Sequence, residues 1–374
     1  MKIAHYLPYY PSCDGSGAFC RGLTRAMNRQ DPGSGIIITC KKGIEAHQDE
    51  VLWYYPKSAN HPFYLPEGLV EDLENKKAHL DGIVLHGTYN PPMVRLAKRL
   101  KKIGMPYLFI PHDPYPPSLR SHHCWRKAVF WHFFERGLIE GARKVQLLDA
   151  SHEHFLRELG LKVGTFVLPN GCEVESLEVL TGEEKVPGEG DFIISFLGRM
   201  DRNHKGLDLL IEGFSEFIQN GPTDAFLVLS GNDWTDRGEL ERLVEKLGIG
   251  ERVRFMGRRP EHSLTIHGEA DLAVLTSRFD GFGLTVVEAM LAKRPVLVSK
   301  EAGVSSHVEK AGGGWVVAPT VAEIANGLRE AYRSREQLKH MGLANQNYVL
   351  SHLTWDQVAA RALEAYREIF ISKS

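Results

Sequence analysis

The sequence alternates from end to end between short apolar runs of strand length and amphipathic runs of helix length. In the first half, the apolar runs are rich in Val, Ile, Leu and aromatic residues, and Gly, Pro or charged residues bound each of them. These runs are Ile3–Leu7, Ile36–Thr39, Ile83–Leu85, Tyr107–Ile110 and Val145–Leu148. Continuous apolar runs are typical of parallel strands that are buried on both faces. The pattern therefore predicts an α/β fold with a doubly wound parallel sheet.

The alternation starts again after Val186–Phe192, where glycine and acidic residues interrupt it. Further strand-like runs follow in the second half. They are Phe192–Gly198, Phe226–Leu229, Val253–Phe255, Leu272–Leu275, Val296–Val298 and Trp315–Val317. A chain of 374 residues is long enough for two cores. We therefore expect two α/β domains joined near residues 175–190, with a ligand at the carboxyl ends of the strands in a cleft between them.

Composition excludes several classes of protein. The net charge of −2 gives no bulk attraction to nucleic acid. The five cysteines are scattered without a C-x-x-C pair, which argues against a zinc site and for reduced thiols in a cytosolic protein. The first residues run into prolines before the apolar region of a signal peptide could form, and no apolar run is long enough to span a bilayer.

A glycine loop follows the first predicted strand. Gly15, Ser16 and Gly17 precede a helix-length run, so the backbone could approach a phosphate or sugar at a helix N-terminus. A strand–helix turn that needs positive φ would explain the same glycines. A dinucleotide-binding loop is a weaker interpretation, because the spacing is not G-x-G-x-x-G and the second strand ends in Cys40 and lysines rather than an acid.

Polar side chains also follow other predicted strands. His112 and Asp113 lie where the strand Tyr107–Ile110 ends. His86 ends the preceding strand in a similar way and is a weaker candidate. A histidine at a strand end can change protonation near neutral pH or simply donate a hydrogen bond. The chain has 17 histidines, so most of them have structural roles.

Two cations follow the first strand of the second half. Arg199 and Lys205 lie six positions apart before Gly206 and an amphipathic run. A guanidinium fork and a point charge suit a diphosphate. The alternative is a solvated charged loop, since Asp201, Arg202 and His204 lie between them.

Two acids flank a glycine-rich turn in "DGFGLTVVEAM", residues 280–290. The segment after the turn has helix-forming content, so Gly283, Leu284 and Thr285 would present backbone N–H groups at a helix start. Asp280 precedes this helix and Glu288 lies within it. Asp280 could be a helix cap and Glu288 a solvated residue, but a glutamate among apolar neighbours requires a partner.

These stretches together resemble the retaining GT-B glycosyltransferases of family 4, also called group 1. The family pattern E-G-F-G-L-x-x-x-E-A-M is matched by residues 280–290. Other stretches occur in the family's order: "PHD" at 111–113, "LPNG" at 168–171, "LGR…HKG" at 197–206, "LSGND" at 229–233, "LGIGERVRFMG" at 247–257 and the terminal "TWDQVAARALEAY". The resemblance covers essentially the whole chain and is strongest in the second half.

The resemblance implies a fold and domain roles. It implies an acceptor-binding Rossmann-like domain at residues 1–178 and a nucleotide-sugar-binding one at 179–354. It also implies that a C-terminal helix, 355–374, crosses back to the first domain. The expected activity is retaining transfer of a sugar, with a UDP-sugar preferred, to a hydroxyl of a glycan or lipid-linked acceptor in polysaccharide or glycoconjugate biosynthesis.

The resemblance also implies residue roles in the second domain. Arg199 and Lys205 would hold the donor diphosphate, Glu288 the ribose hydroxyls and Asp280 the hydroxyls of the transferred sugar. Backbone N–H groups of Phe282, Gly283, Leu284 and Thr285 would contact sugar and phosphate. Further donor-binding residues implied by the matched stretches are Gly231, Asn232 and Arg258, the last in a segment that would run past the base.

In the first domain, the resemblance places Gly15, Ser16 and Gly17 at the diphosphate and His112 near the anomeric centre. His112, Arg199, Lys205 and Asp280 form the expected catalytic set. The sequence departs from the family pattern at two positions. Asp280 stands where Glu is usual and is one methylene shorter, and Lys293 stands where Gly is usual.

The family pattern suggests front-face substitution as the mechanism. No essential metal is expected, because the sequence has no D-x-D motif. The nucleotide-sugar would be a co-substrate rather than a cofactor. The competing hypotheses are a GT-B sugar-nucleotide epimerase, a phosphorylase, or a non-catalytic binder of sugar nucleotides. Aromatic and basic residues in Cys124–Gly137 and Arg95–Gly104 allow peripheral membrane contact through the first domain. Ordinary packed helices, with the aromatic residues in the core, are the favoured explanation of these patches. We expect a cytoplasmic protein, at the inner face of the membrane if these patches bind lipid.

Overall fold

The structure is a computed structural model. It describes residues 1–8, 15–39, 51–53, 65, 67–75, 80–113, 115, 124–174, 177, 189–219, 221–231 and 236–371. The chain divides into two compact units. Unit 1 comprises Met1–Gly171 and Trp355–Ser374, and unit 2 comprises Cys172–Thr354.

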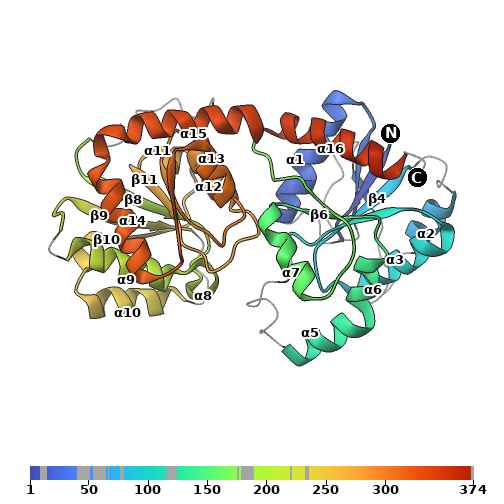
Figure 1. The fold of residues 1–374 in the computed structure, drawn as a ribbon, viewed down its shortest axis with the longest axis horizontal. Coiled ribbons are helices and arrows are strands. Elements are labelled where there is room, and N and C mark those ends of the chain that lie inside the picture. The colour runs from blue at the N-terminus through green and yellow to red at the C-terminus, as the bar shows by residue number, and fades with distance from the viewer. Residues whose placement is uncertain are drawn as a thin grey trace. The chain divides into compact units, whose positions relative to one another are not determined.

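The sheet of unit 1 has seven parallel strands in the order β3-β2-β1-β4-β5-β6-β7 (Figure 1). In chain order they are β1 Ile3–Tyr6, β2 Gly35–Thr39, β3 Val51–Trp53, β4 Gly82–His86, β5 Tyr107–Ile110, β6 Val145–Leu147 and β7 Thr165–Val167. The five predicted runs in this half all form strands. Two short strands, β3 and β7, were not predicted; β7 is only partly buried, whereas β6, of the same length, is fully buried and was predicted.

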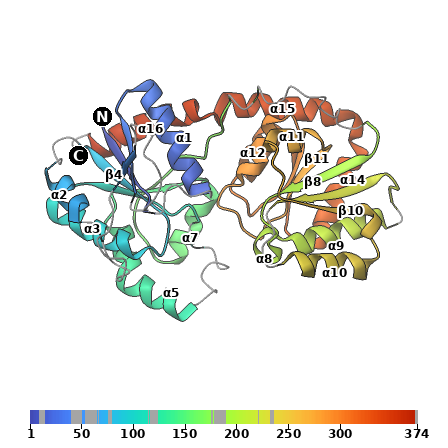
Figure 2. The same ribbon diagram turned by 180° about the vertical axis from the view of Figure 1, so that it is seen from behind.

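Helices of unit 1 cover this sheet. They are α1 Gly15–Gln30, α2 Glu67–Asn75, α3 Pro91–Ile103, α5 Cys124–Phe130, α6 Arg136–Glu140, α7 Glu153–Glu158 and α16 Trp355–Phe370, with a π-helix, η2 Trp131–Glu135, and a 3₁₀ turn, η3 Ala150–His152. α5, η2 and α6 run on without a break, and α5 projects at the edge of the unit (Figure 2).

Unit 2 has six parallel strands in the order β10-β9-β8-β11-β12-β13, which is the doubly wound order of a Rossmann-like domain. The strands are β8 Phe192–Leu197, β9 Ala225–Ser230, β10 Val253–Gly257, β11 Leu272–Leu275, β12 Val296–Ser299 and β13 Gly314–Val317. All six predicted runs form strands here. The four inner runs are mostly buried, whereas the edge strands β10 and β13 are only partly buried.

Helices lie on both sides of this sheet; α9 and α10 are on one side, and α11, α12 and α15 on the other (Figure 1). The helices are α8 Arg202–Lys205, α9 Leu207–Ile218, α10 Arg237–Leu247, α11 Ser263–Gly268, α12 Leu284–Leu291, α13 Ser305–Ala311, α14 Val321–Arg333 and α15 Leu338–His352, with 3₁₀ turns η5 Gly250–Arg252 and η6 Arg335–Gln337. The α/β fold with two doubly wound units is as the sequence predicted.

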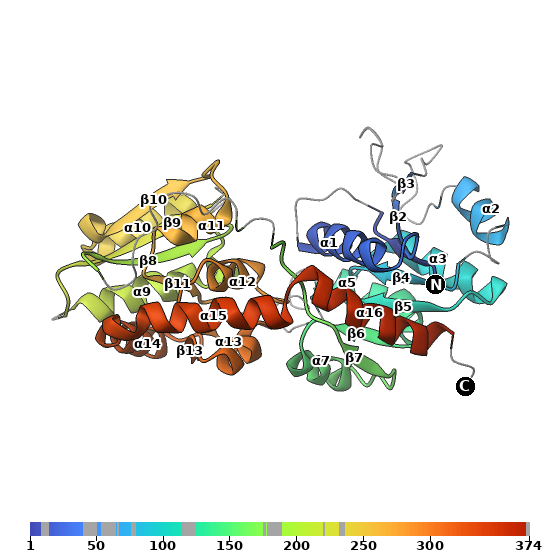
Figure 3. The same cartoon turned by 90° about the horizontal axis from the view of Figure 1, so that it is seen from above.

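The terminal helix α16 belongs to unit 1 and lies alongside α1 (Figure 3). Both are amphipathic, and the small residue Gly22 of α1 lies against the Trp355 ring, where a Cβ would lie 2.1 Å from the nearest ring atom. At the other end of α16, the Phe370 ring lies against Gly82 of β4. Close approach at these glycines holds the helix to the unit.

The chain passes from unit 1 to unit 2 between Gly171 and Cys172. The reason is that the chain changes units where it meets its own return segment. Gly171 packs against Trp355, while the N–H of Cys172 donates to the carbonyl of Leu353 at 2.8 Å. Cys172 and Thr354 also form a β-bridge. The glycine- and acid-rich break used for the prediction lies further along, inside unit 2.

Candidate active site

The loop after β8 carries the two predicted cations of unit 2. Arg199 is exposed just beyond the carboxyl end of the strand. Lys205 ends the short helix α8, and Gly206 follows it with φ of 63°. A Cβ on Gly206 would lie 2.3 Å from the carbonyl oxygen of Thr276, so only glycine allows the loop to approach β11 this closely.

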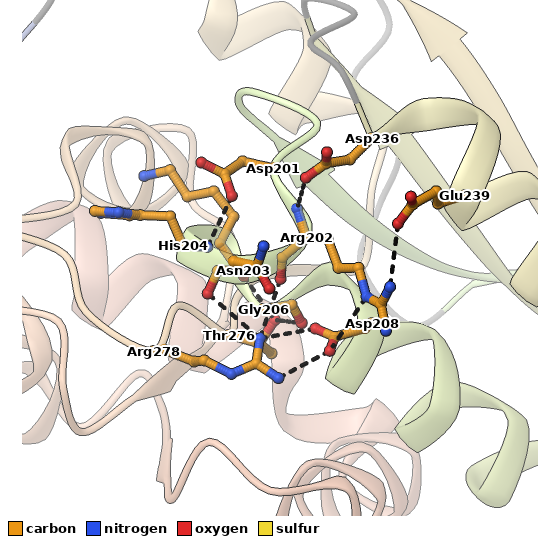
Figure 4. A network of polar contacts seen from close by, with 11 residues as sticks. Asp201, Arg202, Asn203, His204, Gly206, Asp208, Asp236, Glu239, Thr276 and Arg278 are labelled. Atoms are coloured by element: carbon orange, nitrogen blue, oxygen red, sulfur yellow. Dashed lines mark hydrogen bonds and ion pairs between the residues drawn. The ribbon is translucent and has the colours of Figure 1, made fainter. Parts of the chain in front are cut away.

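Polar contacts fix the loop on both sides (Figure 4). Asp201 caps α8 by accepting the N–H of His204 at 2.7 Å. Arg278, just after β11, binds both carboxylate oxygens of Asp208 at 2.8 Å and donates to the carbonyl of Arg202 at 3.0 Å. A two-point Arg–carboxylate contact fixes geometry better than a single bond. The loop is therefore held in place before any ligand binds.

A third anchor lies on the other side of the loop. Asp236 accepts the N–H of Arg202 at 2.9 Å, and Glu239 of α10 accepts from the guanidinium of Arg202 at 3.1 Å. Asp201 and Arg202 thus make structural contacts, although the Arg202 side chain is still 47% exposed. Sequence reasoning missed Asp208, Asp236 and Arg278; their partners lie too far away in the chain for spacing to indicate them.

Lys205 and Asp280 form a short ion pair. The Lys205 Nζ lies 2.5 Å from Asp280 Oδ2, and the two side chains are only 16% and 14% exposed. The pKa of Asp280 lies below its ordinary value: burial alone would raise it, but the charge and hydrogen bond of Lys205 lower it. The two residues that the resemblance assigned to the diphosphate and to the sugar are therefore brought together, and the ion pair favours the ionised form of Asp280.

The turn that follows Asp280 is pinned to the segment after β12. The N–H of Asp280 donates to the backbone carbonyl of Glu301, and the N–H of Val304 donates to the carbonyl of Phe282. The other carboxylate oxygen of Asp280 accepts the N–H of Phe282 at 3.3 Å. The Phe282 N–H, expected to contact the donor, is thus used within the turn, and its side chain is buried.

Gly283 begins α12 with φ of 95° and supplies no side-chain cap. A Cβ there would lie 2.9 Å from Leu275 and 3.1 Å from Val304, so the turn is packed as well as left-handed. Helices leave their first N–H groups without intrahelical partners, and these groups attract anions. The start of α12, with Leu284 and Thr285, therefore lies next to the Lys205–Asp280 pair as a second positive feature.

Glu288 is half-buried in the second turn of α12. Burial raises its pKa to about 7, and a hydrogen bond with the side chain of Ser263, at the start of α11, opposes this rise. The expectation that a glutamate on this apolar helix needs a partner is therefore met by Ser263. A carboxyl group whose pKa lies so close to neutral pH can both accept hydrogen bonds from neighbouring hydroxyls and donate to them.

Glycines at three strand ends frame the region near Arg199. Gly231, after β9, has φ of 147°, and a Cβ on it would lie 1.7 Å from the carbonyl oxygen of Gly198. Its N–H donates to the carbonyl of Gly257 at 2.7 Å. Arg258 follows Gly257 and is exposed, whereas its neighbour Arg259 pairs with Glu261 and Glu269. Asn232 lies outside the described residues.

Unit 1 carries the remaining predicted residues. Gly15, Ser16 and Gly17 form the first turn of α1. His112, just after β5, has a left-handed backbone with φ of 60° and is half-buried. It does not stand alone: His86 Nδ1 lies 3.1 Å from His112 Nε2, and His5 Nδ1 lies 3.0 Å from His86 Nε2. The sequence did not indicate this histidine chain, because β1, β4 and β5 become neighbours only in the sheet.

A buried carboxyl group holds the loops after β4 and β5. Glu135, the last residue of η2, is fully buried, and one of its oxygens accepts the Tyr89 N–H at 2.8 Å and the Tyr115 hydroxyl at 2.7 Å. Burial raises the pKa of Glu135 to about 7, although both hydrogen bonds lower it. Tyr89 and Tyr115 have φ of 52° and 59°, so left-handed backbone gathers in these two loops. Nothing in the sequence pattern indicated a π-helix that ends on a buried acid.

Within the described ranges, no group of three or more His, Cys, Asp and Glu side chains is arranged to hold a metal ion. Nor does any helix there have the length and apolar character needed to cross a membrane. Cys20 and Cys172 are both buried.

The fold class of the whole chain is that of GT-B glycosyltransferases. Two solved structures share it: sucrose-phosphate synthase of Thermosynechococcus elongatus, with a TM-score of 0.75 at 20% identity over 100% of both chains, and HepE of Anabaena in complex with UDP, with a TM-score of 0.74 at 19% identity over 98% of this chain and 99% of the other.

Most of unit 2 resembles one family. Residues 182–348 match the model for glycosyl transferases group 1. D-inositol 3-phosphate glycosyltransferase of Nocardia farcinica is 30% identical over 184 residues, which are 47% of this chain and 40% of that relative. The chain thus spans less than half the length of this relative. For 2-deoxystreptamine glucosyltransferase of Streptomyces kanamyceticus, identity is 30% over 271 residues, 68% of this chain and 66% of the relative.

Proposed function

We propose that this protein is a retaining, metal-independent glycosyltransferase that moves a sugar from a nucleotide-sugar to a hydroxyl of a glycan or lipid-linked acceptor. The observation that carries the proposal is the arrangement around Lys205 in unit 2. An ammonium group, a carboxylate and an uncapped helix start lie together at the carboxyl end of a Rossmann-like sheet. This arrangement suits a ligand that has a diphosphate and a sugar side by side.

The ion pair leaves both side chains able to bind the donor. The Lys205 ammonium group gives one of its three N–H donors to Asp280 Oδ2, so the others can bind a diphosphate oxygen. Each carboxylate oxygen of Asp280 can accept a second hydrogen bond, so Asp280 can also accept a sugar hydroxyl. The shorter Asp at this position then orients the sugar from the turn rather than from an extended side chain.

The reaction would proceed by front-face substitution. The bond between the anomeric carbon and the diphosphate oxygen breaks, the acceptor oxygen bonds to the same face of that carbon, and the departing oxygen takes the acceptor's proton. Lys205, Arg199 and the first N–H groups of α12 would stabilise the negative charge that develops on the diphosphate. Asp280 is not assigned as a base, since both its oxygens already accept hydrogen bonds.

The nucleotide is proposed to sit beside unit 2's other candidate residues. Glu288 would hold the ribose hydroxyls, and Gly231, Asn232 and Arg258 would line the base and phosphate. In unit 1, Gly15–Gly17 would meet the diphosphate and His112 the sugar. A UDP-sugar is the preferred donor; a solved structure with this fold, HepE, is a UDP complex, which supports trying UDP-sugars first.

Peripheral membrane contact is proposed for the continuous α5–η2 helix. Trp125, Val129 and Phe133 lie four residues apart and are 67%, 49% and 67% exposed, so they form one apolar stripe. Arg126 and Lys127 lie beside it. Aromatic and basic residues on one helix suit the inner face of a membrane in the cytoplasm. Co-flotation with anionic vesicles, lost in a Trp125→Ala/Phe133→Ala variant that remains folded, would support it.

Thermal shifts with UDP-, GDP- and ADP-sugars test the donor, because a ligand that binds only the native state raises the unfolding temperature. Release of nucleoside diphosphate is then followed with and without added acceptor sugars, in EDTA. Acceptor-dependent release in EDTA with retained anomeric configuration supports the proposal. Isomerised donor without release indicates an epimerase, phosphate-dependent turnover a phosphorylase, and tight binding without turnover a binding protein.

A further inference from the structure

Three histidines from neighbouring strands of unit 1 form a line of hydrogen bonds. His5 lies in β1, His86 ends β4 and His112 follows β5. The distances are 3.0 Å from His5 Nδ1 to His86 Nε2 and 3.1 Å from His86 Nδ1 to His112 Nε2. The His86 and His112 rings are stacked with centroids 5.3 Å apart, and Phe19 of α1 packs against both. The line runs from the core of the sheet to its carboxyl edge.

The two inner rings are neutral. His5 is 0% and His86 1% exposed. Burial lowers the pKa of His5 to about 3, and burial together with the charges of its two histidine neighbours holds the pKa of His86 well below its ordinary value. Each of these rings therefore carries a single N–H. A hydrogen bond between two such rings needs a proton on one nitrogen and a lone pair on the other.

Only two arrangements of protons satisfy both hydrogen bonds. In the outward arrangement, His5 Nδ1–H donates to His86 and His86 Nδ1–H donates to His112 Nε2. In the inward arrangement every bond is reversed, and the innermost proton lies on His5 Nε2. Among the described residues, His5 Nε2 is buried without a hydrogen-bond partner. A buried N–H without an acceptor is rarer and costs more than a buried nitrogen lone pair without a donor. The outward arrangement, which leaves only the lone pair of His5 Nε2 unused, is therefore favoured.

We propose that His5 and His86 are positioning residues that keep His112 neutral, with its proton on Nδ1. His112 then offers an N–H donor, not a base, to an oxygen of the donor sugar. The choice of a sugar oxygen rests on the proposed function; the tautomer does not. Because His112 Nε2 accepts from His86, a second proton could enter the ring only by breaking or reversing the chain. His112 therefore stays a donor over the neutral range of pH.

Three other ionisable groups of the described residues lie near the histidine chain: Tyr366, Cys20 and Asp113. The Tyr366 ring of α16 lies beside His5, but burial holds the pKa of Tyr366 well above its ordinary value and its hydroxyl donates to Gln146. Cys20 of α1 is buried near Tyr366. Asp113 follows His112 and is half-buried at the same edge.

The tautomer is tested directly by long-range ¹H–¹⁵N correlation spectra of the ligand-free, full-length protein, with the His112 signal assigned by its loss in His112→Gln. We expect the pattern of a ring protonated at Nδ1 that does not titrate between pH 6 and 8. A ring protonated at Nε2, or one that titrates near its ordinary pKa of about 6.5, overturns the proposal. Neither result depends on any transfer activity.

Two substitutions of His86 form a matched pair. The amide nitrogen of Asn lies where His Nδ1 lies, so His86→Asn keeps the donor to His112 and loses the bond to His5. The amide nitrogen of Gln lies where His Nε2 lies, so His86→Gln keeps the bond to His5 and loses the donor to His112. We expect the Nδ1 tautomer in His86→Asn, and a His112 signal that titrates between pH 6 and 8 in His86→Gln. Equal behaviour of two folded variants contradicts the positioning role.

Ligand measurements separate a sugar oxygen from a phosphate oxygen. With UDP-glucose as the probe, His86→Gln should lower kcat/KM about tenfold relative to His86→Asn, since one hydrogen bond is lost. The Kd of UDP alone should be the same in both variants. Weaker UDP binding in His86→Gln would overturn the sugar assignment. If no nucleotide-sugar is turned over, the proposed function fails, while the spectra still decide the tautomer.

Discussion

The two units place polar groups at the carboxyl ends of similar sheets, but they control charge in opposite ways. In unit 2, Asp280 is ionised and paired with Lys205, and its pKa is lowered. In unit 1, burial raises the pKa of Glu135 to about 7, and His5 and His86 are neutral. The difference shows that one topology supports two kinds of strand-end site: one with fixed opposite charges, which suits a charged ligand, and one with neutral hydrogen bonds, which suits an uncharged one.

The largest effect is expected from removing the cation of the charged site. Lys205→Ala should lower transfer a hundredfold or more, about 3 kcal/mol, because one preorganised donor to the developing charge is lost. Arg199→Ala should have a similar effect. Nucleoside diphosphate release measures both, with the exposed α10 variant Lys246→Ala as control. Near-normal turnover by a folded Lys205→Ala protein would contradict the role of this charged site in transfer.

The raised pKa of Glu135 in unit 1 predicts a pH effect of similar size on stability. The pKa of Glu135 is raised from 4.5 to about 7 in the fold, so native protein binds this proton more tightly than unfolded protein. Its contribution is fully present below about pH 4.5 and is lost as pH rises through about 7. Between pH 5 and 8, wild type should lose up to about 3 kcal/mol more than Glu135→Gln, which cannot ionise.

Urea unfolding at both pH values measures this difference. The control is Glu140→Gln, which changes an exposed acid on α6 that pairs with Arg136 and should leave the pH dependence as in wild type. Glu288 titrates in the same range and is present in all three proteins, so its contribution cancels. Parallel stability curves for wild type and Glu135→Gln would mean that Glu135 is ionised, and the contrast between the units would fail.

A smaller effect is expected from loosening the loop that carries Lys205. Arg278→Ala removes the two-point contact with Asp208 and the bond to the Arg202 carbonyl. Since Arg278 is 37% exposed, we expect only about 1 kcal/mol of lost stability, but roughly a tenfold loss of transfer. Arg329→Ala breaks a similarly exposed pair with Glu216 on α9 and should cost stability alone. Equal activity of the two variants would show that the loop needs no anchor.

The smallest effect concerns Lys293, just after α12. Its φ of 59° lies in the left-handed region, where a residue with a Cβ costs about 1 kcal/mol relative to glycine. Lys293→Gly should therefore stabilise the protein by about 1 kcal/mol in thermal unfolding. Lys293→Ala, which loses the same side-chain contacts but keeps the Cβ, should give no such gain. A gain for both variants would assign the effect to the side chain.

Sequence reasoning located what local pattern determines. The long buried strands and the glycine turn at residues 280–283 were found because apolar runs, glycines and charges have local meaning. The Lys205–Asp280 pair, the Arg278–Asp208 contact and the histidine chain were not found, since their partners lie 26 to 81 residues apart and meet only through the parallel sheet. Short edge strands such as β7 and the unit boundary at Gly171 likewise depend on tertiary contacts.

The return of the chain into unit 1 also sets an order for biosynthesis. Residues 172–354 form one uninterrupted stretch, so unit 2 can close as soon as it leaves the ribosome. Unit 1 must wait for α16, because the face of α1 at Gly22 and the end of β4 at Gly82 are covered by Trp355 and Phe370. The half of the protein synthesised first is therefore the half completed last. Until α16 packs against it, unit 1 exposes an apolar face that a chaperone would bind.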